Sequence, residues 1–283
     1  MPIALVTGTS TGIGQATAIA LARAGHVVYA GMRNLAAAEP LTSVASSENV
    51  RIVAIQMDVD DDGSVSRAVE GVTAAEGRID VLVNNAGVGG GGPVEETPLV
   101  KFRQMMETNF FGVLRCTQAV LPGMRERRSG CIVNISSVAG RLAMAPQGAY
   151  AASKWAVEAL SECLAQEMAA FNVRVAIVEP GVIATPIFTK AERPEGPSSY
   201  GQLARLMGFF QESLKNPVSP FVVADVIVNF VNGDSRQLRH PAGPDAGPII
   251  AWRQSITDEQ MVAITDADFA AAMKGVLGLG ASA

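Results

Sequence analysis

Short runs of mostly apolar residues alternate with longer segments of helical periodicity along the first two thirds of the chain. The apolar runs predict strands at 3–7, 26–31, 51–56, 79–84, 130–136 and 173–179, and the helical pattern is found at roughly 12–24, 62–75, 99–123 and 151–170. Strands that are apolar on both sides are typical of a parallel sheet covered on both faces. The alternation therefore predicts right-handed βαβ units and an α/β fold, a doubly wound parallel β-sheet with helices on both faces.

The pattern changes after the last of these strands. Five prolines lie within 186–220 around a short helical run, and beyond about 240 the periodicity is too weak to assign elements. No low-complexity linker or break in composition divides the chain. We therefore expect a single domain over 1–283, with a segment at about 186–216 that stands apart from the sheet and a C-terminal extension at about 240–283.

The composition allows a large buried core and excludes several classes of function. Hydrophobic residues make up 48% of the 283 and charged residues 17%, with a formal net charge of −5. The densest basic run, RERR at 125–128, follows a predicted helix, so we expect no nucleic-acid partner. The two histidines and three cysteines lack the spacing of metal ligands. No apolar run has the length of a membrane span and no signal peptide is visible, so we expect a cytoplasmic protein without a membrane partner.

A glycine-rich loop, VTGTSTGIG at 6–14, joins the first predicted strand to the first predicted helix. Gly8, Gly12 and Gly14 let the chain turn tightly and let its backbone approach a ligand closely. The helix that follows offers free N–H groups and the positive end of its dipole to phosphates. In this context the loop predicts a Rossmann-type, dinucleotide-binding and catalytic domain, with an ordinary glycine turn as the alternative.

The end of the second predicted strand indicates the type of dinucleotide. An acidic residue there would bond the ribose 2′-hydroxyl of NAD(H) and repel a 2′-phosphate. Here Met32 stands where the acid is expected, and Arg33 follows. Because arginine can hold a phosphate through two hydrogen bonds, NADP(H) is favoured, with NAD(H) as the second cofactor. The alternative is that Arg33 merely solvates a strand end.

Candidate chemistry comes from a tyrosine and a lysine in YAASK, at 150–154. Tyr150 and Lys154 are four positions apart, so on a helix they share a face. Such a pair on its own is usually a packing or surface feature. Here, however, polar residues that follow the predicted strands converge with it at the carboxyl edge of the sheet, where ligands bind in open α/β folds.

Further motifs follow in a fixed order: DV at 58–59, NNAG at 84–87, Asn109, NISS at 134–137, YAASK, and PG at 180–181 with Thr185. In this order and spacing the chain resembles the single-domain form of the short-chain dehydrogenase/reductase family, closely over roughly 3–190 and weakly beyond. The stretch VYAGMRN is similar to hydroxysteroid-dehydrogenase-like members. One departure is Glu179, which precedes Pro180 where the family more often has asparagine.

The resemblance implies an NAD(P)(H)-dependent oxidoreductase that transfers a hydride between the nicotinamide and an alcohol or ketone. The catalytic tetrad of the family falls on Asn109, Ser137, Tyr150 and Lys154. Besides Tyr150 and Lys154, the implied cofactor contacts are Gly8, Ser10, Thr11, Gly12, Ile13, Gly14, Arg33, Asp58, Val59, Asn85, Ala86, Gly87, Pro180, Gly181, Ile183 and Thr185.

The lysine has a physical reason to stand beside the tyrosine. A free tyrosine, with a pKa of about 10, is a poor acid–base group at neutral pH. An ammonium about 4 Å away, at an effective dielectric of about 20, would stabilise the tyrosinate by about 4 kcal/mol, or about three pKa units. We therefore expect Lys154 to lower the pKa of Tyr150. Ser137 would donate to the developing oxyanion, and Asn109 would hold a water beside Lys154.

The substrate side is predicted from the segment 200–212, whose apolar face consists of Leu203, Leu206, Met207 and Phe210. The face is either core or, with prolines at both borders, a lid over an apolar substrate. Ser137, Met144 and Val88 would contact the same substrate. A steroid-like, lipid-like or 3-oxoacyl molecule would fit such a pocket.

Assembly and two other functions stay open. The apolar helices at 99–123 and 151–170 often pair between subunits in the resembled family, so we expect a homodimer or homotetramer, with a monomer as the alternative. A non-catalytic nucleotide-sensing protein would be expected to lose the tyrosine or the lysine, and this chain has both. A sugar epimerase or dehydratase would need a larger C-terminal domain and a different glycine spacing.

Overall fold

Seven parallel strands form one sheet, in the order β3-β2-β1-β4-β5-β6-β7, in the computed structural model, which describes residues 1–190 and 198–276. The strands are β1 (Ile3–Thr7), β2 (Val27–Met32), β3 (Ile52–Gln56), β4 (Val81–Asn84), β5 (Gly130–Ile135), β6 (Val173–Pro180) and β7 (Arg239–Ala242). The six predicted strands are confirmed, and β7 is an additional one at the edge. The strand order reverses between β1 and β4, which places a crevice for ligands at their carboxyl ends.

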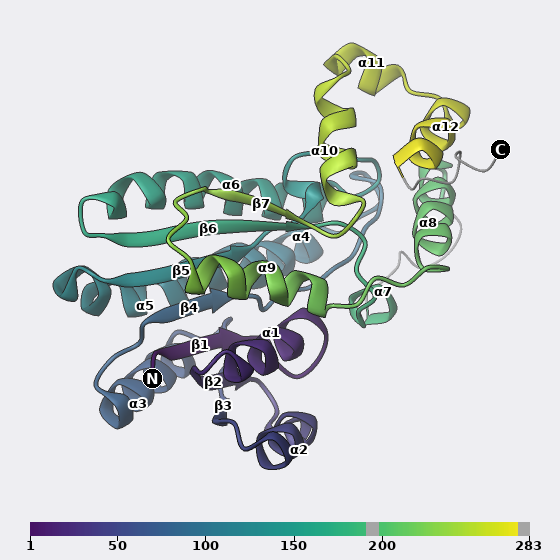
Figure 1. Ribbon diagram of the computed structural model, residues 1–283. Helices are drawn as coiled ribbons and strands as arrows, with labels where there is room; N and C mark the ends of the chain where they lie inside the picture. The colour runs from purple at the N-terminus through teal and green to yellow at the C-terminus, as the bar shows by residue number, and fades with distance from the viewer. Residues whose placement is uncertain (191–197, 277–283) are drawn as a thin grey trace.

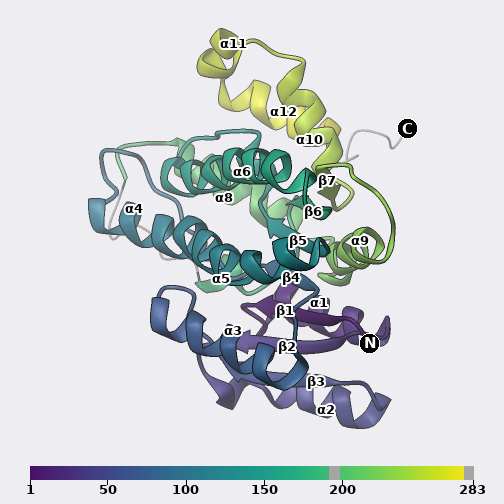
Figure 2. The same ribbon diagram turned by 90° about the vertical axis from the view of Figure 1, so that its left-hand side faces the viewer.

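Helices cover both faces of the sheet, as Figures 1 and 2 show. One face carries α1 (Gly12–Arg23), α2 (Glu39–Glu48) and α9 (Phe221–Asn232), and the other carries α3 (Asp62–Glu76), α5 (Gly112–Arg127) and α6 (Gly148–Ala169). Alternate residues of each strand face opposite layers: Ala4 and Val6 pack toward the first face, and Ile3 and Leu5 toward the second. The doubly wound α/β prediction is thereby confirmed.

The segment predicted as one helix at 99–123 is interrupted. It consists of α4 (Leu99–Met106), a π-helical turn η2 (Glu107–Phe111) and α5. The amide of Gly112 donates to the carbonyl of Glu107, five residues back. Such single π turns are frequent at functional sites, and this one carries Asn109.

The C-terminal third, where the pattern assigned few elements, is helical. It contains α7 (Ile187–Lys190), α8 (Gln202–Ser213), α10 (Ala246–Gln254), α11 (Asp258–Ala263) and α12 (Asp266–Val276), which lie beyond the carboxyl ends of the strands (Figure 1). They are joined to the loops after β5 and β6 by a separate apolar cluster of Leu142, Val182, Phe209, Ile249, Phe269 and Met273. Parts of two predicted segments, 191–197 and 277–283, lie outside the described residues.

Within the described ranges, no helix combines the length and the apolar character needed to cross a membrane.

Candidate active site

Tyr150 lies in the first turn of α6, opposite Ser137, which follows β5. The Ser137 hydroxyl lies beside the Tyr150 phenol and accepts a hydrogen bond from the Ala139 amide at 3.1 Å. The short 3-10 turn η3 (Val138–Gly140) fixes this position, because Ser137 is its N-cap. A serine hydroxyl and a phenol thus meet at the carboxyl edge of the sheet, as predicted from their motifs.

Lys154 lies one turn further along α6 and is buried. Its Nζ atom donates to the carbonyl of Ile135 at 2.9 Å and lies 5.8 Å from the centroid of the Tyr150 ring. Burial lowers the pKa of the Lys154 ammonium to about 8, against an opposing effect of the Glu158 carboxylate. Lys154 therefore keeps most of its charge at neutral pH but loses it at a lower pH than a free lysine does.

The predicted lowering of the Tyr150 pKa is wrong for the protein without a cofactor. Burial of the phenol raises the pKa of Tyr150 above its ordinary value of 10, and the neighbouring Ser137 hydroxyl opposes this rise. Desolvation of the tyrosinate thus outweighs the attraction of Lys154, whose ammonium is engaged with a backbone carbonyl. In this state the phenol holds its proton, as a proton donor must.

Asn109 is fully buried, and its side-chain amide has three partners. It accepts from the Val88 amide at 2.8 Å and donates to the Val88 carbonyl and to Ser153 Oγ, each at 3.0 Å. A Cβ atom on Gly87 would lie 3.2 Å from Asn109 Oδ1 and 3.9 Å from Lys154 Nζ. Asn109 therefore ties the loop after β4 to η2 and α6, and its predicted role in holding a water stays a prediction.

The glycine loop is packed against the loop after β4 too closely for side chains. Gly8 has φ +69°, and a Cβ atom there would lie 2.7 Å from Ala86 Cα. A Cβ atom on Gly14 would lie 2.3 Å from Asn85 Nδ2. The hydroxyl of Thr7 accepts from the amides of Asn85 and Ala86 at 3.0 and 2.9 Å. The two loops form one rigid unit at the switch point between β1 and β4.

This unit fits the pyrophosphate of a dinucleotide. Gly12 also has a positive φ, +64°, and Thr11, the N-cap of α1, makes no side-chain capping bond. The first amides of α1 are therefore not capped by a side chain and can bind an anion. Ser10 and Ile13 are half-buried in the same loop. Thr185 lies across from it, since a Cβ atom on Gly12 would be 3.2 Å from Thr185 Cβ.

On the adenine side the structure separates the two residues that suggested NADP(H). Met32 is 2% exposed and packs in the core, whereas Arg33 is exposed. Asp58 accepts from the amide of Asp60, and Val59 is buried against Gly112. Only the side chain of Arg33, of these two, is available to a 2′-phosphate.

Asp60 was missed by the sequence analysis. One of its carboxylate oxygens accepts from the Thr108 hydroxyl at 2.9 Å, and the other has no hydrogen-bond partner. Burial raises the pKa of Asp60, and the Arg33 guanidinium opposes the rise. The acidic run DVDDDG at 58–63 was the available signal.

The segment after β6 is held by a second missed residue, Asp245. Its carboxylate accepts from the Val182 amide at 2.8 Å, and the Gly181 amide donates to the Ala242 carbonyl at 3.0 Å. Pro180 ends β6, and Ile183 points into the core at 2% exposure. The Thr185 side chain, rather than that of Ile183, is what faces the glycine loop.

The predicted apolar face of α8 is split. Leu206 is buried and Leu203, Met207 and Phe210 are half-buried. The most buried aromatic of the helix is Phe209, which was not predicted and packs edge-on against Phe269 of α12. The Phe210 ring instead meets Phe188 of α7, with centroids 5.0 Å apart.

A hollow of about 580 Å³ lies beside the N-terminus of α6. Met144, predicted at the substrate, lines it together with Pro93, Val94, Glu95, Ala143, Ala145, Pro146, Gly148, Ala151, Tyr200 and Gln202. The Tyr200 hydroxyl donates to Glu95, and the Ser199 amide donates to Glu96 at 2.9 Å, so the chain before α8 is fastened to the loop at 93–97. Leu206 does not line this hollow.

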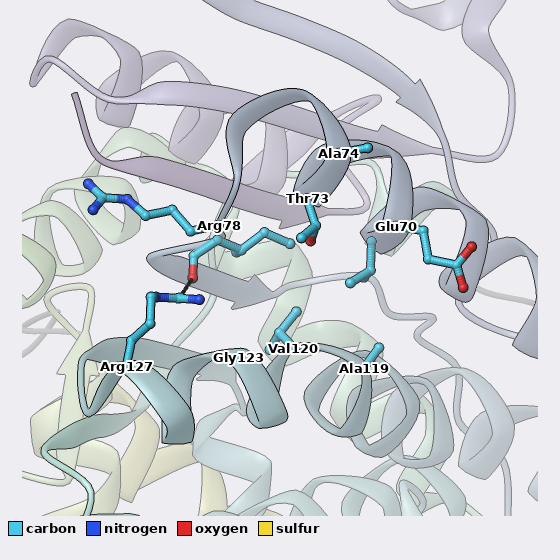
Figure 3. Close-up of a pocket in the computed structure, with 10 residues that line it drawn as sticks. Glu70, Thr73, Ala74, Arg78, Ala119, Val120, Gly123 and Arg127 are labelled. Atoms are coloured by element: carbon cyan, nitrogen blue, oxygen red, sulfur yellow. Dashed lines mark hydrogen bonds between the residues drawn. The ribbon is translucent and has the colours of Figure 1, made fainter.

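A second hollow, of about 490 Å³, lies between α3 and α5 (Figure 3). Arg127 extends across it and donates to the Ile79 carbonyl at 2.7 Å. It is close to the amino end of β4, opposite to the edge where the polar residues converge. Within the described residues, no group of three or more histidine, cysteine, aspartate or glutamate side chains could hold a metal.

Comparisons with known proteins agree with this geometry. A family described as short chain dehydrogenase matches residues 2–196. The 3-ketodihydrosphingosine reductase of Bacteroides thetaiotaomicron is 44% identical over 180 residues, which cover 63% of this chain and 63% of that protein, less than two thirds of its length.

Two solved structures extend the likeness over most of the chain. A short-chain dehydrogenase from Streptomyces avermitilis is 38% identical, with a TM-score of 0.82 over 90% of this chain and 92% of that one. An alcohol dehydrogenase from the archaeon Thermococcus sibiricus, complexed with 5-hydroxy-NADP, is 27% identical, with a TM-score of 0.73 over 85% of this chain and 95% of that one.

Proposed function

Because this chain belongs to the short-chain dehydrogenase/reductase family of oxidoreductases, we propose that it interconverts an alcohol and a ketone with NADP(H), and that Tyr150 is its acid and base. The observation that carries the proposal is that Ser137 and Lys154 both lie beside Tyr150, at the same edge of the sheet as the glycine loop. When bound, the nicotinamide supplies or accepts the hydride.

The residues of the chain divide the remaining work. In reduction, Tyr150 gives its proton to the carbonyl oxygen as negative charge develops there, and Ser137 donates a hydrogen bond to the same oxygen. Lys154, as an ammonium, stabilises the tyrosinate that is left. Asn109 holds the loop after β4 in place beside Lys154.

The preference for NADP(H) rests on Arg33. Its side chain is exposed just after β2, and it acts electrostatically on the half-buried carboxylate of Asp60. A guanidinium there suits a 2′-phosphate. The alcohol dehydrogenase complexed with 5-hydroxy-NADP is a structural neighbour that supports this choice.

An apolar substrate is supported by the lining of the hollow near α6. Most of its side chains are apolar, from Pro93 and Val94 to Met144 and Pro146. The relative from Bacteroides thetaiotaomicron is named as a 3-ketodihydrosphingosine reductase. We place the carbonyl at Ser137 and Tyr150 and the apolar part toward Met144. The segment 186–216 then serves as the lid of a single domain over 1–283, its part at 191–197 lying outside the described residues.

A homo-oligomer completes the proposal. Phe111 of η2 and Trp155 of α6 are 44% and 49% exposed on neighbouring elements. Large exposed apolar side chains that lie together commonly mark contact surfaces. A two-fold interface over η2 and α6 would bury both.

The test is oxidation of NADPH and of NADH by the purified protein, followed at 340 nm, across a panel of ketones, steroids, quinones and 3-oxoacyl thioesters. We expect turnover with NADPH and with apolar ketones first. Cofactor binding without turnover of any panel member would favour the nucleotide-sensing alternative, and faster turnover with NADH would overturn the cofactor preference.

A further inference from the structure

A network of buried charges lies behind Lys154, away from Tyr150. Glu158, one turn beyond Lys154 on α6, is 5% exposed, and Glu179 at the end of β6 is 1% exposed. Both carboxylates are approached by Arg239, at the start of β7. Neither β7 nor this network was expected from the sequence.

Arg239 forks between two glutamates of α6. Its Nε atom lies 3.0 Å from Glu158 Oε2, and its Nη2 atom lies 3.0 Å from Glu162 Oε2. The same Nε atom is 3.8 Å from Glu179 Oε1, which is also paired with Arg141 at 3.1 Å. Glu162 differs from the other two glutamates because its side chain is 55% exposed.

Arg239 favours the ionised form of Glu158, with which it forms an ion pair. Burial raises the pKa of Glu158, and the neighbouring Glu179 raises it further. The nearby Ser136 hydroxyl and the guanidinium of Arg239 lower it, and on balance the pKa stays raised. Glu179 has a second cation in Arg141, whereas the guanidinium at Glu158 is that of Arg239 alone among the described residues. Without Arg239, a proton would neutralise Glu158 more easily than the site would keep a buried anion.

Glu158 in turn acts on Lys154. The two side chains are four residues apart and share a face of α6. Lys154 has lost most of its contact with water, and its one hydrogen bond recorded in the described structure is to the Ile135 carbonyl. The groups that face it are the phenol of Tyr150, the amide of Asn109 and the carboxylate of Glu158, of which Glu158 brings the negative charge.

We propose that Glu158 and Arg239 are positioning residues that keep Lys154 protonated inside the site. The charged groups lead from β7 to the candidate active site: Arg239 keeps Glu158 ionised, and Glu158 keeps Lys154 as an ammonium. Arg239 lies outside the residues 2–196 that match the family, and the inference rests on the proposed function only where turnover is measured. It assigns a task to the edge strand β7, which brings Arg239 to α6.

The first test needs neither cofactor nor substrate. Competitive acetylation with acetic anhydride across pH, with the Lys154 peptide quantified by mass spectrometry, reports the pKa of Lys154 in the free protein. In Glu158→Gln this pKa is expected to fall by about one unit or more from the wild-type value, because the negative charge one helical turn from Lys154 is removed. Glu162→Gln is the matched control, since it removes the exposed carboxylate from the same arginine, and is expected to leave the Lys154 pKa unchanged.

Arg239 provides the second pair of variants. Arg239→Gln should lower the Lys154 pKa as Glu158→Gln does, Arg239→Lys should restore it, and the double variant Glu158→Gln/Arg239→Gln should show no further fall. Thermal melting shows which variants fold. If Glu158→Gln does not fold, the comparison of Arg239→Gln with Arg239→Lys decides. An unchanged Lys154 pKa in a folded Glu158→Gln or Arg239→Gln protein overturns the proposal.

Turnover separates this inference from the proposed function. In Glu158→Gln, the alkaline limb of kcat/KM against pH should move to lower pH by the same amount as the Lys154 pKa. A wild-type protein without any NADPH-dependent turnover, but with the expected acetylation shifts, would refute the function and leave the charge network standing. Normal turnover with an unmoved alkaline limb in folded Glu158→Gln would refute the network and leave the function standing.

Discussion

At the scale of single residues, burial decides the chemistry of the site. The phenol of Tyr150 keeps its proton because its surroundings desolvate the tyrosinate, and burial lowers the pKa of the Lys154 ammonium in the same way. Both pKa values depend on the surroundings of the side chains, so a ligand bound beside Tyr150 and Lys154 would change them. The sequence predicts a lowered Tyr150 pKa because it shows the Lys154 charge but not the burial of the phenol, and burial raises the pKa instead.

Gly14 tests the glycine loop with a single methyl group. A Cβ atom there would collide with Asn85 Nδ2 at 2.3 Å and with the Gly8 carbonyl at 2.4 Å, so Gly14→Ala should lose cofactor binding and melt at lower temperature. Gly71→Ala is the control: Gly71 is exposed in α3 with nothing within 4 Å of the added atom, and the change should stabilise by about 0.5–1 kcal/mol. Fluorescence titration with NADPH and urea unfolding measure both. Unimpaired NADPH binding by Gly14→Ala would contradict the proposal that the glycine loop binds the pyrophosphate.

Arg33 tests the choice of cofactor. Arg33→Gln should weaken NADPH binding about tenfold or more and leave NADH binding unchanged, because a charge-assisted contact to the 2′-phosphate is lost. Met32→Asp is a poor test, since it would place a carboxylate in the core, where Met32 is 2% exposed. Arg51→Gln, in which an arginine paired with Glu76 is changed, is the control and should affect neither cofactor. Equal loss of both cofactors in Arg33→Gln would show that the arginine does not read the phosphate.

At the scale of elements, the sequence predicts helices and strands that have a local apolar pattern. It misses elements that form through contacts with distant parts of the chain. The central strands β1, β2, β4, β5 and β6 follow from their apolar runs, because both of their faces are buried. The edge strand β3 is less buried but also has an apolar run. The edge strand β7, with the sequence RHPA, has no such run and exists through its pairing with β6. The π turn at Asn109 is equally invisible, since its side chain bonds to Val88, a residue 21 positions away.

The site divides in the same way. Ser137, Tyr150 and Lys154 can be proposed from the sequence because they fall in motifs whose order and spacing match the family. Four other residues cannot be predicted in this way, because each interacts with a residue that is distant in the chain: Asp60, Asp245, Glu158 and Arg239.

Helix α8 gives the prediction at this scale. Phe209 packs against Phe269, so Phe209→Ala should destabilise by about 3–5 kcal/mol. Phe210 is half-buried against Phe188, and Phe210→Ala should raise the KM for apolar ketones with a smaller loss of stability. Thermal melting and steady-state kinetics of the two neighbouring variants separate core from lid. If Phe210→Ala loses as much stability as Phe209→Ala and keeps its KM, the whole face is core and the lid does not exist.

At the scale of the whole molecule, the sheet and the C-terminal helices have different roles. The sheet brings the glycine loop, Ser137 and Thr185 to one edge, since parallel strands all end there. The cluster around Phe209 and Phe269 then fixes α8, α10 and α12 beyond that edge (Figure 1). A sequence pattern can indicate the first arrangement, but the second depends on contacts between helices far apart in the chain.

The assembly is tested on the exposed face of η2 and α6. Trp155→Glu should dissociate the oligomer, because a carboxylate cannot be buried in an apolar contact without a partner. Val262→Glu, at an 88% exposed position on α11, is the control and should keep the wild-type mass. Sedimentation velocity gives the mass of each. A monomeric wild-type protein, or a Trp155→Glu protein of unchanged mass, would contradict an interface at this face.

The central claim is that Tyr150 is the acid and base of an NADP(H)-dependent reaction, and one measurement tests it most directly. NADPH binding and ketone turnover are compared in the wild type, in Tyr150→Phe, and in Tyr29→Phe, which removes a phenol bound to Glu76 instead. We predict that Tyr150→Phe binds NADPH with wild-type affinity and loses turnover by a factor of about 10² or more, while Tyr29→Phe keeps its turnover. Turnover by Tyr150→Phe at close to the wild-type rate would contradict the account.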